Sequence, residues 1–135
     1  MRQHLHSVVV SYNRLELTKQ AIASYLATVT GPYSLIVVDN NSTDGTREWL
    51  NVAFLDGPHD QFLVFPENKY PGYATNRGWA LAAEHTMLLH RADNDFTYLE
   101  GWADLVREQF AANERLGQLG LRTADRKSTR LNSSH

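Results

Sequence analysis

Short, continuously apolar runs alternate with helical stripes along most of this chain. Four such runs predict strands: Ser7–Tyr12, Ser34–Val38, Phe62–Phe65 and Thr86–Leu89. Apolar residues fill these runs without alternating with polar ones, as is typical of strands covered by helices on both faces. A regular strand–helix alternation favours right-handed crossovers between parallel strands. The pattern therefore predicts an α/β fold with a mostly parallel sheet.

Amphipathic stretches separate or follow the predicted strands. Apolar residues at helical spacing predict four helices, over Leu15–Val29, around Trp49 and Leu50, over Tyr73–Glu84 and over Gly101–Asn113. Ser42 is a candidate N-cap for the second of these helices. Leu119–Arg122 could begin a fifth strand. With 135 residues, the chain is long enough for one domain but not for two.

Composition excludes several classes of function. The formal net charge of −2 provides no basic surface, so we expect no nucleic acid partner. The chain has no cysteine, which rules out thiolate chemistry and disulfides. No apolar run approaches the ~18 residues of a membrane span, and the first residues lack a signal-peptide core. We expect a cytoplasmic protein with no membrane segment in this chain, and a peripheral position at the inner face of the membrane for the full-length protein.

The last eleven residues, Asp125–His135 (DRKSTRLNSSH), depart from this pattern because they are strongly polar and contain one leucine. They resemble the translation of a common sequencing-library adapter. We therefore predict that residues 125–135 are a non-native tail and that residues 1–124 are an incomplete domain. A disordered native tail is the alternative.

Polar and acidic residues follow each predicted strand. They comprise Ser11, Tyr12, Asn13 and Arg14 after the first, Asp39, Asn40 and Asn41 after the second, Glu67 and Asn68 after the third, and Asp93, Asn94 and Asp95 after the fourth. Ligands of open parallel sheets bind outside the carboxyl ends of the strands, near the point where the strand order reverses. The sequence therefore predicts a polar binding site at one edge of the sheet.

Each part of this site has a structural alternative. Asp93 and Asp95 could form a solvated turn, because Asp and Asn are favoured turn residues; a divalent cation would instead make the acidic pair favourable. Asp39 could bind a base or ribose, or cap a helix. The glycines and the helix start in Asn68–Gly78 could approach a phosphate, with Arg77 beside it, or could simply permit close helix packing.

Four stretches, in order, resemble the family-2 glycosyltransferases, which are nucleotide-sugar-dependent enzymes of the GT-A fold. The matching stretches are VVVSYNR at Val8–Arg14, VVDNNSTDGT at Val37–Thr46, the N-x-x-x-G-x-A-x-N-x-G spacing of Asn68–Gly78, and RADNDFTYLEGW at Arg91–Trp102. The resemblance implies a Rossmann-like (GT-A), mostly parallel sheet flanked by helices. This chain would be its N-terminal donor-binding portion, truncated after the fourth or fifth strand.

The resemblance also implies roles for individual residues. Those that would bind the nucleotide sugar are Ser11, Tyr12, Asn13, Asp39, Asn68, Gly72, Asn76, Arg77 and Asp93. Among them, Tyr12 would line the base and ribose pocket, Asp39 would hold the base and Arg77 would face the diphosphate. Asp93 would contact the ribose or the metal, and Asp95 would bind Mg²⁺ or Mn²⁺ bridging the two phosphates. The implied donor is a UDP- or GDP-sugar.

The implied reaction transfers a sugar from a nucleoside-diphosphate sugar to an acceptor hydroxyl, usually with inversion, and a carboxylate base deprotonates that hydroxyl. In the family this base lies well after the D-x-D segment. Here Asp104 and Glu108 fall on the solvated face of a predicted helix. We therefore expect this chain to lack the acceptor site and the base, and to be inactive by itself. The sequence does not identify the acceptor.

Two other functional classes compete with this interpretation. A nicotinamide-dependent oxidoreductase would need G-x-G-x-x-G after the first strand, and SYNRLE contains no glycine there. A non-catalytic nucleotide-binding domain or a phospho-acceptor signalling domain is the remaining alternative. The signalling domain would place its acids after the first and third strands, whereas here they follow the second and fourth.

Overall fold

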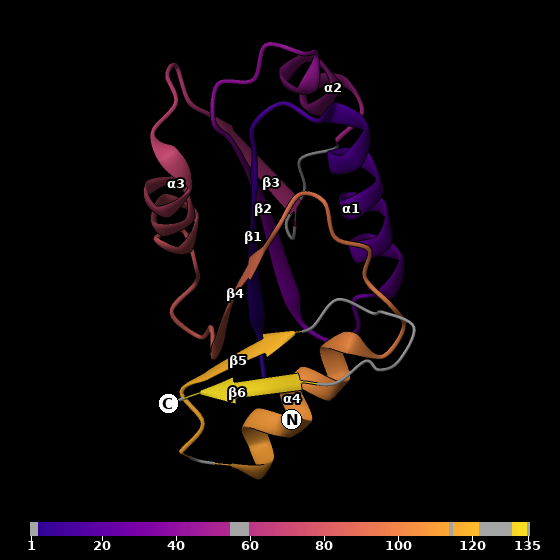
Figure 1. The fold of residues 1–135 in the computed structure, drawn as a ribbon. Helices are drawn as coiled ribbons and strands as arrows, with labels where there is room; N and C mark the ends of the chain where they lie inside the picture. Colours follow the sequence, from indigo (N-terminus) through magenta and orange to yellow (C-terminus); the bar gives the residue numbers. More distant parts are fainter. Residues whose placement is uncertain (1–2, 55–59, 114, 122–130, 135) are drawn as a thin grey trace.

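The computed structural model describes residues 3–54, 60–113, 115–121 and 131–134. Within them, four parallel strands form the main sheet, in the order β3-β2-β1-β4 (Figure 1). These strands are β1 (Leu5–Ser11), β2 (Tyr33–Asp39), β3 (Asp60–Val64) and β4 (Leu88–Ala92). The helices are α1 (Leu15–Thr28), α2 (Thr46–Val52), α3 (Tyr70–Trp79) and α4 (Trp102–Ala112). The predicted α/β fold with a mostly parallel sheet is confirmed.

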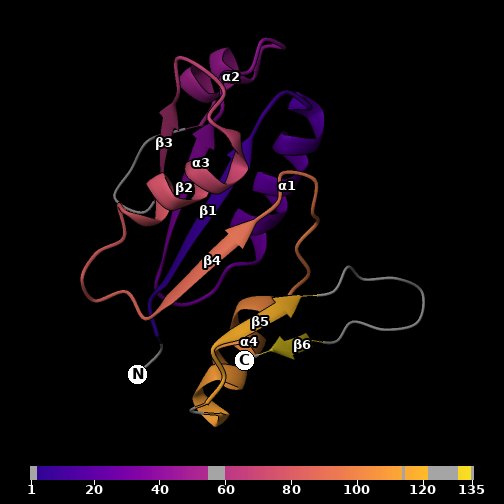
Figure 2. The ribbon, with the colours of Figure 1, turned by 60° about the vertical axis from the view of Figure 1, so that its left-hand side comes forward.

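Helices cover both faces of the sheet, which explains why its strands are so apolar. α1 and α2 lie on one face and α3 lies on the other (Figures 1 and 2). Alternate residues of β1 serve the two sides: Val9 joins a large core with Tyr25 of α1, and Val8 joins a smaller core with Ala74 of α3. α4 extends the larger core through Trp102 and Val106.

The strand order reverses beside β1. The chain passes from β1 outward through β2 to β3, and then returns to place β4 on the other side of β1. Ser11 pairs with Asp39 of β2, and Val9 pairs with Ala92 of β4. The carboxyl ends of β1 and β4 therefore lie next to each other at a topological switch point, where α/β folds bind ligands.

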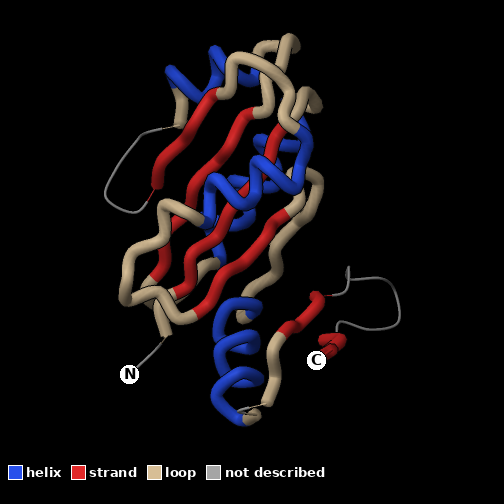
Figure 3. Tube along the Cα trace, turned by 90° about the vertical axis from the view of Figure 1, so that its left-hand side faces the viewer, coloured by secondary structure: helices blue, strands red, loops and turns tan. Residues whose placement is uncertain are grey.

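A second, smaller sheet is formed by two antiparallel strands, β5 (Gln118–Leu121) and β6 (Leu131–Ser134). It stands apart from the main sheet, near α4 (Figure 3). The predicted fifth strand therefore exists but does not extend the parallel sheet. Of the tail that we predict to be non-native, residues 125–130 and 135 lie outside the described residues, and its origin stays a prediction. No helix in the described ranges is long and apolar enough to cross a membrane.

Several element boundaries differ from the sequence predictions. α3 begins at Tyr70 rather than Tyr73, because Pro71 fits the first turn of a helix. It ends at Trp79, and the chain then continues in tight turns. In one of these turns the N–H of Leu81 donates a hydrogen bond to the carbonyl of Gly78. Ser42 does not cap α2; Gly45 occupies that position. β4 runs to Ala92 because pairing with β1 carries it through two polar residues.

Candidate functional site

A cleft of about 370 Å³ opens at the switch point between β1 and β4. Residues from four segments line it: Val10, Tyr12, Arg14, Asn40, Asn68, Tyr70, Pro71, Arg91, Ala92, Asp93 and Asn94. They come from the ends of β1 and β4, from the loop after β2, and from the start of α3. The structure thus brings Tyr12, Asn68 and Asp93, three of the predicted site residues, to one cavity.

The loop after β1 is tied to the loop after β2. The backbone N–H of Asn13 donates to Ser42 Oγ at 2.7 Å, and the Asn13 side chain accepts from the N–H of Thr43 at 2.8 Å. Asn13 and Arg14 both have a φ of 59°, a left-handed conformation that is uncommon outside glycine. Asn13 therefore shapes the loop that presents Tyr12 and Arg14 to the cleft, and it does not line the cleft itself.

Asp39, the last residue of β2, has no exposed surface. Its carboxylate accepts hydrogen bonds from the Ser11 hydroxyl at 2.8 Å, from the Ser42 hydroxyl at 2.5 Å and from the Ser42 N–H at 2.9 Å. The Ser11 bond joins the ends of β1 and β2, and the two Ser42 bonds close the loop after β2. Ser11 and Asp39 are both buried and absent from the cleft lining. The contact with a nucleobase implied for Asp39 stays a prediction.

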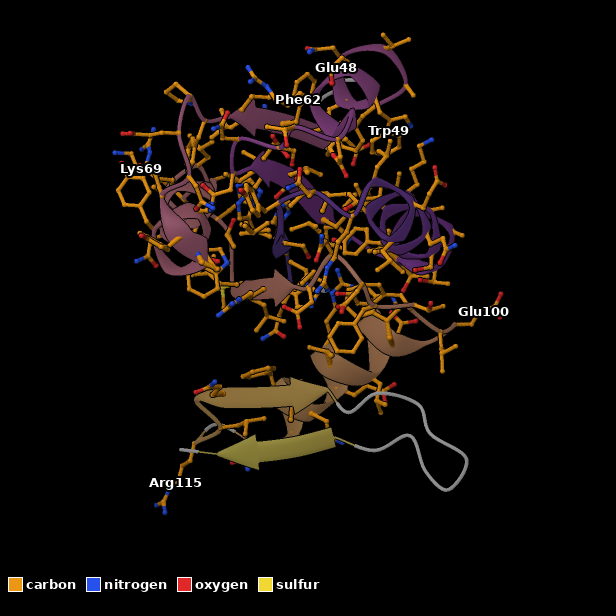
Figure 4. All side chains as sticks on the ribbon, turned by 45° about the horizontal axis from the view of Figure 1, so that its top comes forward. Glu48, Trp49, Phe62, Lys69, Glu100 and Arg115 are labelled. Atoms are coloured by element: carbon orange, nitrogen blue, oxygen red, sulfur yellow. The ribbon has the colours of Figure 1, made fainter. Side chains whose placement is uncertain are left out.

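The segment before α3 is fixed by two side-chain amides. Asn40, which is 1% exposed, accepts from the N–H of Lys69 at 2.7 Å, and Asn68 accepts from the N–H of Tyr70 at 2.8 Å. Lys69 marks the start of the helix in Figure 4 and pairs with Glu67 at 2.5 Å. Asn40 and Asn68 thus hold the cleft wall in place as well as lining it.

Three predicted site residues lie further along α3. Gly72, Asn76 and Arg77 are exposed and do not belong to the cleft lining. Apart from its chain neighbours and the backbone of its own helix, no described atom lies within 4 Å of a Cβ built on Gly72, so no packing contact requires glycine there. Their roles in binding a nucleotide sugar stay predictions.

The loop after β4 carries both acidic residues and is anchored to α1. Asn94 donates to Thr18 Oγ1 at 3.2 Å, and the N–H of Tyr98 donates to Ser24 Oγ at 2.9 Å. Asp93 is exposed in the cleft. Burial raises the pKa of the Tyr98 phenol, and the charge of Asp93 raises it further, so the two side chains are electrostatically coupled. This loop therefore has a defined position relative to the sheet.

Two arginines to which the sequence analysis assigned no role give the cleft positive charge. Arg14 and Arg91 both line it, and Arg14 also pairs with Asp95 across 3.7 Å. Guanidinium groups bind phosphate oxygens through paired hydrogen bonds. The sequence analysis placed Arg14 at the predicted binding edge, directly after the first strand, but gave it no contact with a ligand. Arg91 was not predicted to reach the site, because the fourth strand was predicted to end at Leu89.

A divalent cation is compatible with the acidic residues. In the described part of the chain, no three His, Cys, Asp or Glu side chains gather as a complete metal site. Mg²⁺, however, is usually held by one or two carboxylates together with substrate phosphates and water. Asp93 and Asp95 are both exposed, and their oxygens suit a hard cation. These donors fit a metal that arrives with a diphosphate.

A buried polar network supports β4 behind the cleft. His90 Nδ1 lies 2.9 Å from Ser7 Oγ, which also accepts from the Tyr25 hydroxyl at 2.7 Å. The imidazole is surrounded by the rings of Tyr25, Tyr98 and Trp102. Burial lowers the pKa of His90 to about 4, so the ring is neutral at physiological pH.

Known proteins share both the sequence pattern and the fold. The family described as "Glycosyl transferase family 2" matches residues 7–135. An uncharacterized glycosyltransferase of Nostoc sp. is 30% identical over 89 residues, which is 65% of this chain and 28% of that protein. The solved structure of a mannosyltransferase from Pyrobaculum calidifontis, in complex with GDP-Man and Mn²⁺, superposes with a TM-score of 0.68. At 19% identity it covers 87% of this chain and 34% of its own, and shows likeness of fold alone.

Proposed function

The chain belongs to glycosyl transferase family 2, and we propose that its cleft binds the nucleoside diphosphate of a sugar donor together with a divalent cation. One observation carries the proposal: Arg14, Arg91 and Asp93 meet in one cleft at the switch point of the sheet. Two arginines suit a diphosphate, and an exposed carboxylate beside them suits a cation bound to it.

Each part of the cleft takes one part of the donor. Tyr12 offers a flat surface, 48% exposed, for the base. Arg14 and Arg91 bind the diphosphate. Asp93 and Asp95 would hold Mg²⁺ or Mn²⁺, which would neutralise the charge on the departing nucleoside diphosphate. The Mn²⁺ and GDP-mannose bound by the Pyrobaculum mannosyltransferase support this assignment.

The proposal concerns donor binding and assigns no catalytic base to this chain. The chain spans about 28% of the length of the Nostoc relative, so transfer to an acceptor, its stereochemistry and the acceptor itself are proposals for the whole protein. We propose that the acceptor site and its base lie outside the described residues, and that residues 1–124 are the donor-binding part. Attachment at the inner face of a membrane also stays a prediction.

Calorimetric titration of the chain with UDP and GDP, with and without Mn²⁺, tests the proposal. We expect one of these nucleotides to bind at a single site. Omitting Mn²⁺ or introducing Asp93→Asn should each weaken binding about tenfold, because the first removes the cation and the second removes a charged ligand of that cation. Glu48→Gln is the matched control, because Glu48 is an exposed acid on α2, away from the cleft lining (Figure 4).

The two halves of the proposal fail in different ways. Nucleotide binding that is unchanged by Asp93→Asn and by omission of Mn²⁺ would remove the metal role and leave the nucleotide site standing. Failure of every nucleoside diphosphate to bind the correctly folded chain would reject the nucleotide site as well.

A further inference from the structure

Tyr70 has a left-handed backbone conformation, which is unfavourable for a residue with a bulky side chain. Its φ is 68°, and in the described part of the chain the other non-glycine residues with positive φ are Asn13, Arg14 and Asn41. Asparagine adopts this conformation readily, whereas for a bulky residue such as tyrosine it is an outlier. Strained residues that cluster at a binding site point to a functional reason for the strain.

The surrounding structure imposes this conformation on Tyr70. Its N–H donates to Asn68 Oδ1 at 2.8 Å, and the preceding N–H, of Lys69, donates to Asn40 Oδ1 at 2.7 Å. Asn40 is itself buried, and its N–H donates to the carbonyl of Ser11 at 2.8 Å. Asn40 thus connects the segment from Asn68 to Tyr70 to the end of β1.

Packing does not explain why tyrosine stands at this position. The residue is 75% exposed, so its ring gains little from burial. Tyr70 lines the cleft, as does Tyr12, which is also exposed. Two aromatic residues therefore border one cavity from different segments, the loop after β1 and the start of α3.

We propose that Tyr70 and Tyr12 hold the nucleobase of the donor between their rings. This inference rests on the proposed nucleotide site and names the contact that sets the strength of base binding. Every base has a flat π-face, and stacking on an aromatic side chain contributes regardless of which base is bound. The strained backbone of Tyr70 is the structural cost of presenting its ring to the cleft.

The chemistry of the cleft favours the base over the diphosphate as the ligand of Tyr70. Arg14, Arg91 and Asp93 provide the charges that phosphates and a cation need. The two tyrosines instead offer apolar faces with a polar edge. A base fits between such faces, and the diphosphate then continues toward the arginines.

Substitutions at Tyr70 test the proposal through binding of UMP and GMP, which carry a base but no sugar donor group. Tyr70→Asn removes the ring and keeps a residue that tolerates positive φ. It should weaken binding of the monophosphates about tenfold, whereas Tyr70→Phe, which keeps the ring, should bind them as the parent chain does. Tyr73→Asn is the matched control, because Tyr73 is exposed on the same helix but does not line the cleft.

A thermal melt separates loss of binding from loss of folding. Because Tyr70→Asn relieves strain, its melting temperature should equal or exceed that of the parent chain while its affinity falls. Equal affinity of Tyr70→Asn and the parent chain would overturn the inference and leave the proposed function intact. A loss confined to nucleotide sugars would overturn it too, since the ring would then contact the sugar. If the parent chain binds no nucleotide, both proposals fall.

Discussion

Replacing Gly78 with alanine tests the packing that places α3 against the sheet. A Cβ built on Gly78 lies 2.7 Å from both methyl carbons of Val8 and 3.3 Å from Val38 Cγ2. Carbon atoms in proteins pack at about 3.5–4.0 Å, so the added methyl overlaps Val8 by nearly 1 Å. Val8 is fully buried and stiff at χ1, and it cannot move aside. The helix must therefore move away from the strand.

The expected free-energy change follows from two opposing terms. Overpacking a buried site costs about 1–3 kcal/mol, and the double overlap with Val8 places Gly78→Ala at the upper end. Alanine regains about 1 kcal/mol because it is a better helix former than glycine. We therefore expect a net loss of about 2 kcal/mol. The bond from His6 Nε2 to the Gly78 carbonyl, 2.9 Å long, should also lengthen as the helix moves.

Urea unfolding followed by tryptophan fluorescence measures this change. The midpoint for Gly78→Ala should fall by about 1 M. Gly72→Ala is the matched control, because it makes the same substitution in the same helix, where the added Cβ meets no described atom of another element within 4 Å. This variant should be at least as stable as the parent chain. In the double variant with Val8→Ala, the loss should be smaller than the sum of the two single losses. Equal stability of Gly78→Ala and Gly72→Ala would refute the reasoning.

Two further predictions concern groups outside the cleft. Burial lowers the pKa of His90 from 6.5 to about 4. Between these two pH values the unfolded chain binds a proton at His90 and the folded chain does not. The free energy of unfolding should therefore be at its full value above pH 6.5 and fall by up to about 3 kcal/mol as the pH drops to 4. Chemical unfolding across this pH range should show a weaker dependence in His90→Asn; a slope of the opposite sign would contradict the assignment. Arg107→Met should cost about 3 kcal/mol, because the buried guanidinium donates to the carbonyls of Gln3, Thr30 and Pro32. Arg115→Met, at an exposed site (Figure 4), should change stability little, and equal losses from both substitutions would count against a special role for Arg107.

The layered fold was predictable because its signals are local. Runs such as Val8–Val10 and Leu35–Val38 have no polar residue to place toward water, so they must lie inside a covered sheet. Helical spacing of apolar residues then supplies the covering layers. Parallel strands separated by helices also fix which strand ends share an edge, and the predicted edge is where the cleft lies.

Details that depend on distant partners were less predictable. Arg91 reaches the cleft because β4 continues beyond its apolar residues into a polar stretch, where Arg91 pairs with Val8 of β1. Tyr70 takes a left-handed conformation because Asn40 and Asn68 hold its loop, and no property of tyrosine itself indicates this. Asp39 illustrates the opposite case. A carboxylate at a strand end suggested ligand contact. The structure shows that this carboxylate accepts one hydrogen bond from Ser11 of β1 and two from Ser42 in the loop after β2, and its contact with a ligand stays a prediction.

The central claim is that the cleft between β1 and β4 is the nucleotide site, and amide NMR spectra of the chain test it most directly. On addition of UDP or GDP with Mg²⁺, we expect the shifted resonances to gather at Tyr12–Arg14, Asn68–Tyr70 and Arg91–Asn94. Substituting Mn²⁺ should broaden the signals nearest Asp93 and Asp95. Amides of β5 should be unaffected. Shifts that concentrate on β5 and α4, or a spectrum that neither nucleotide changes, would contradict the claim.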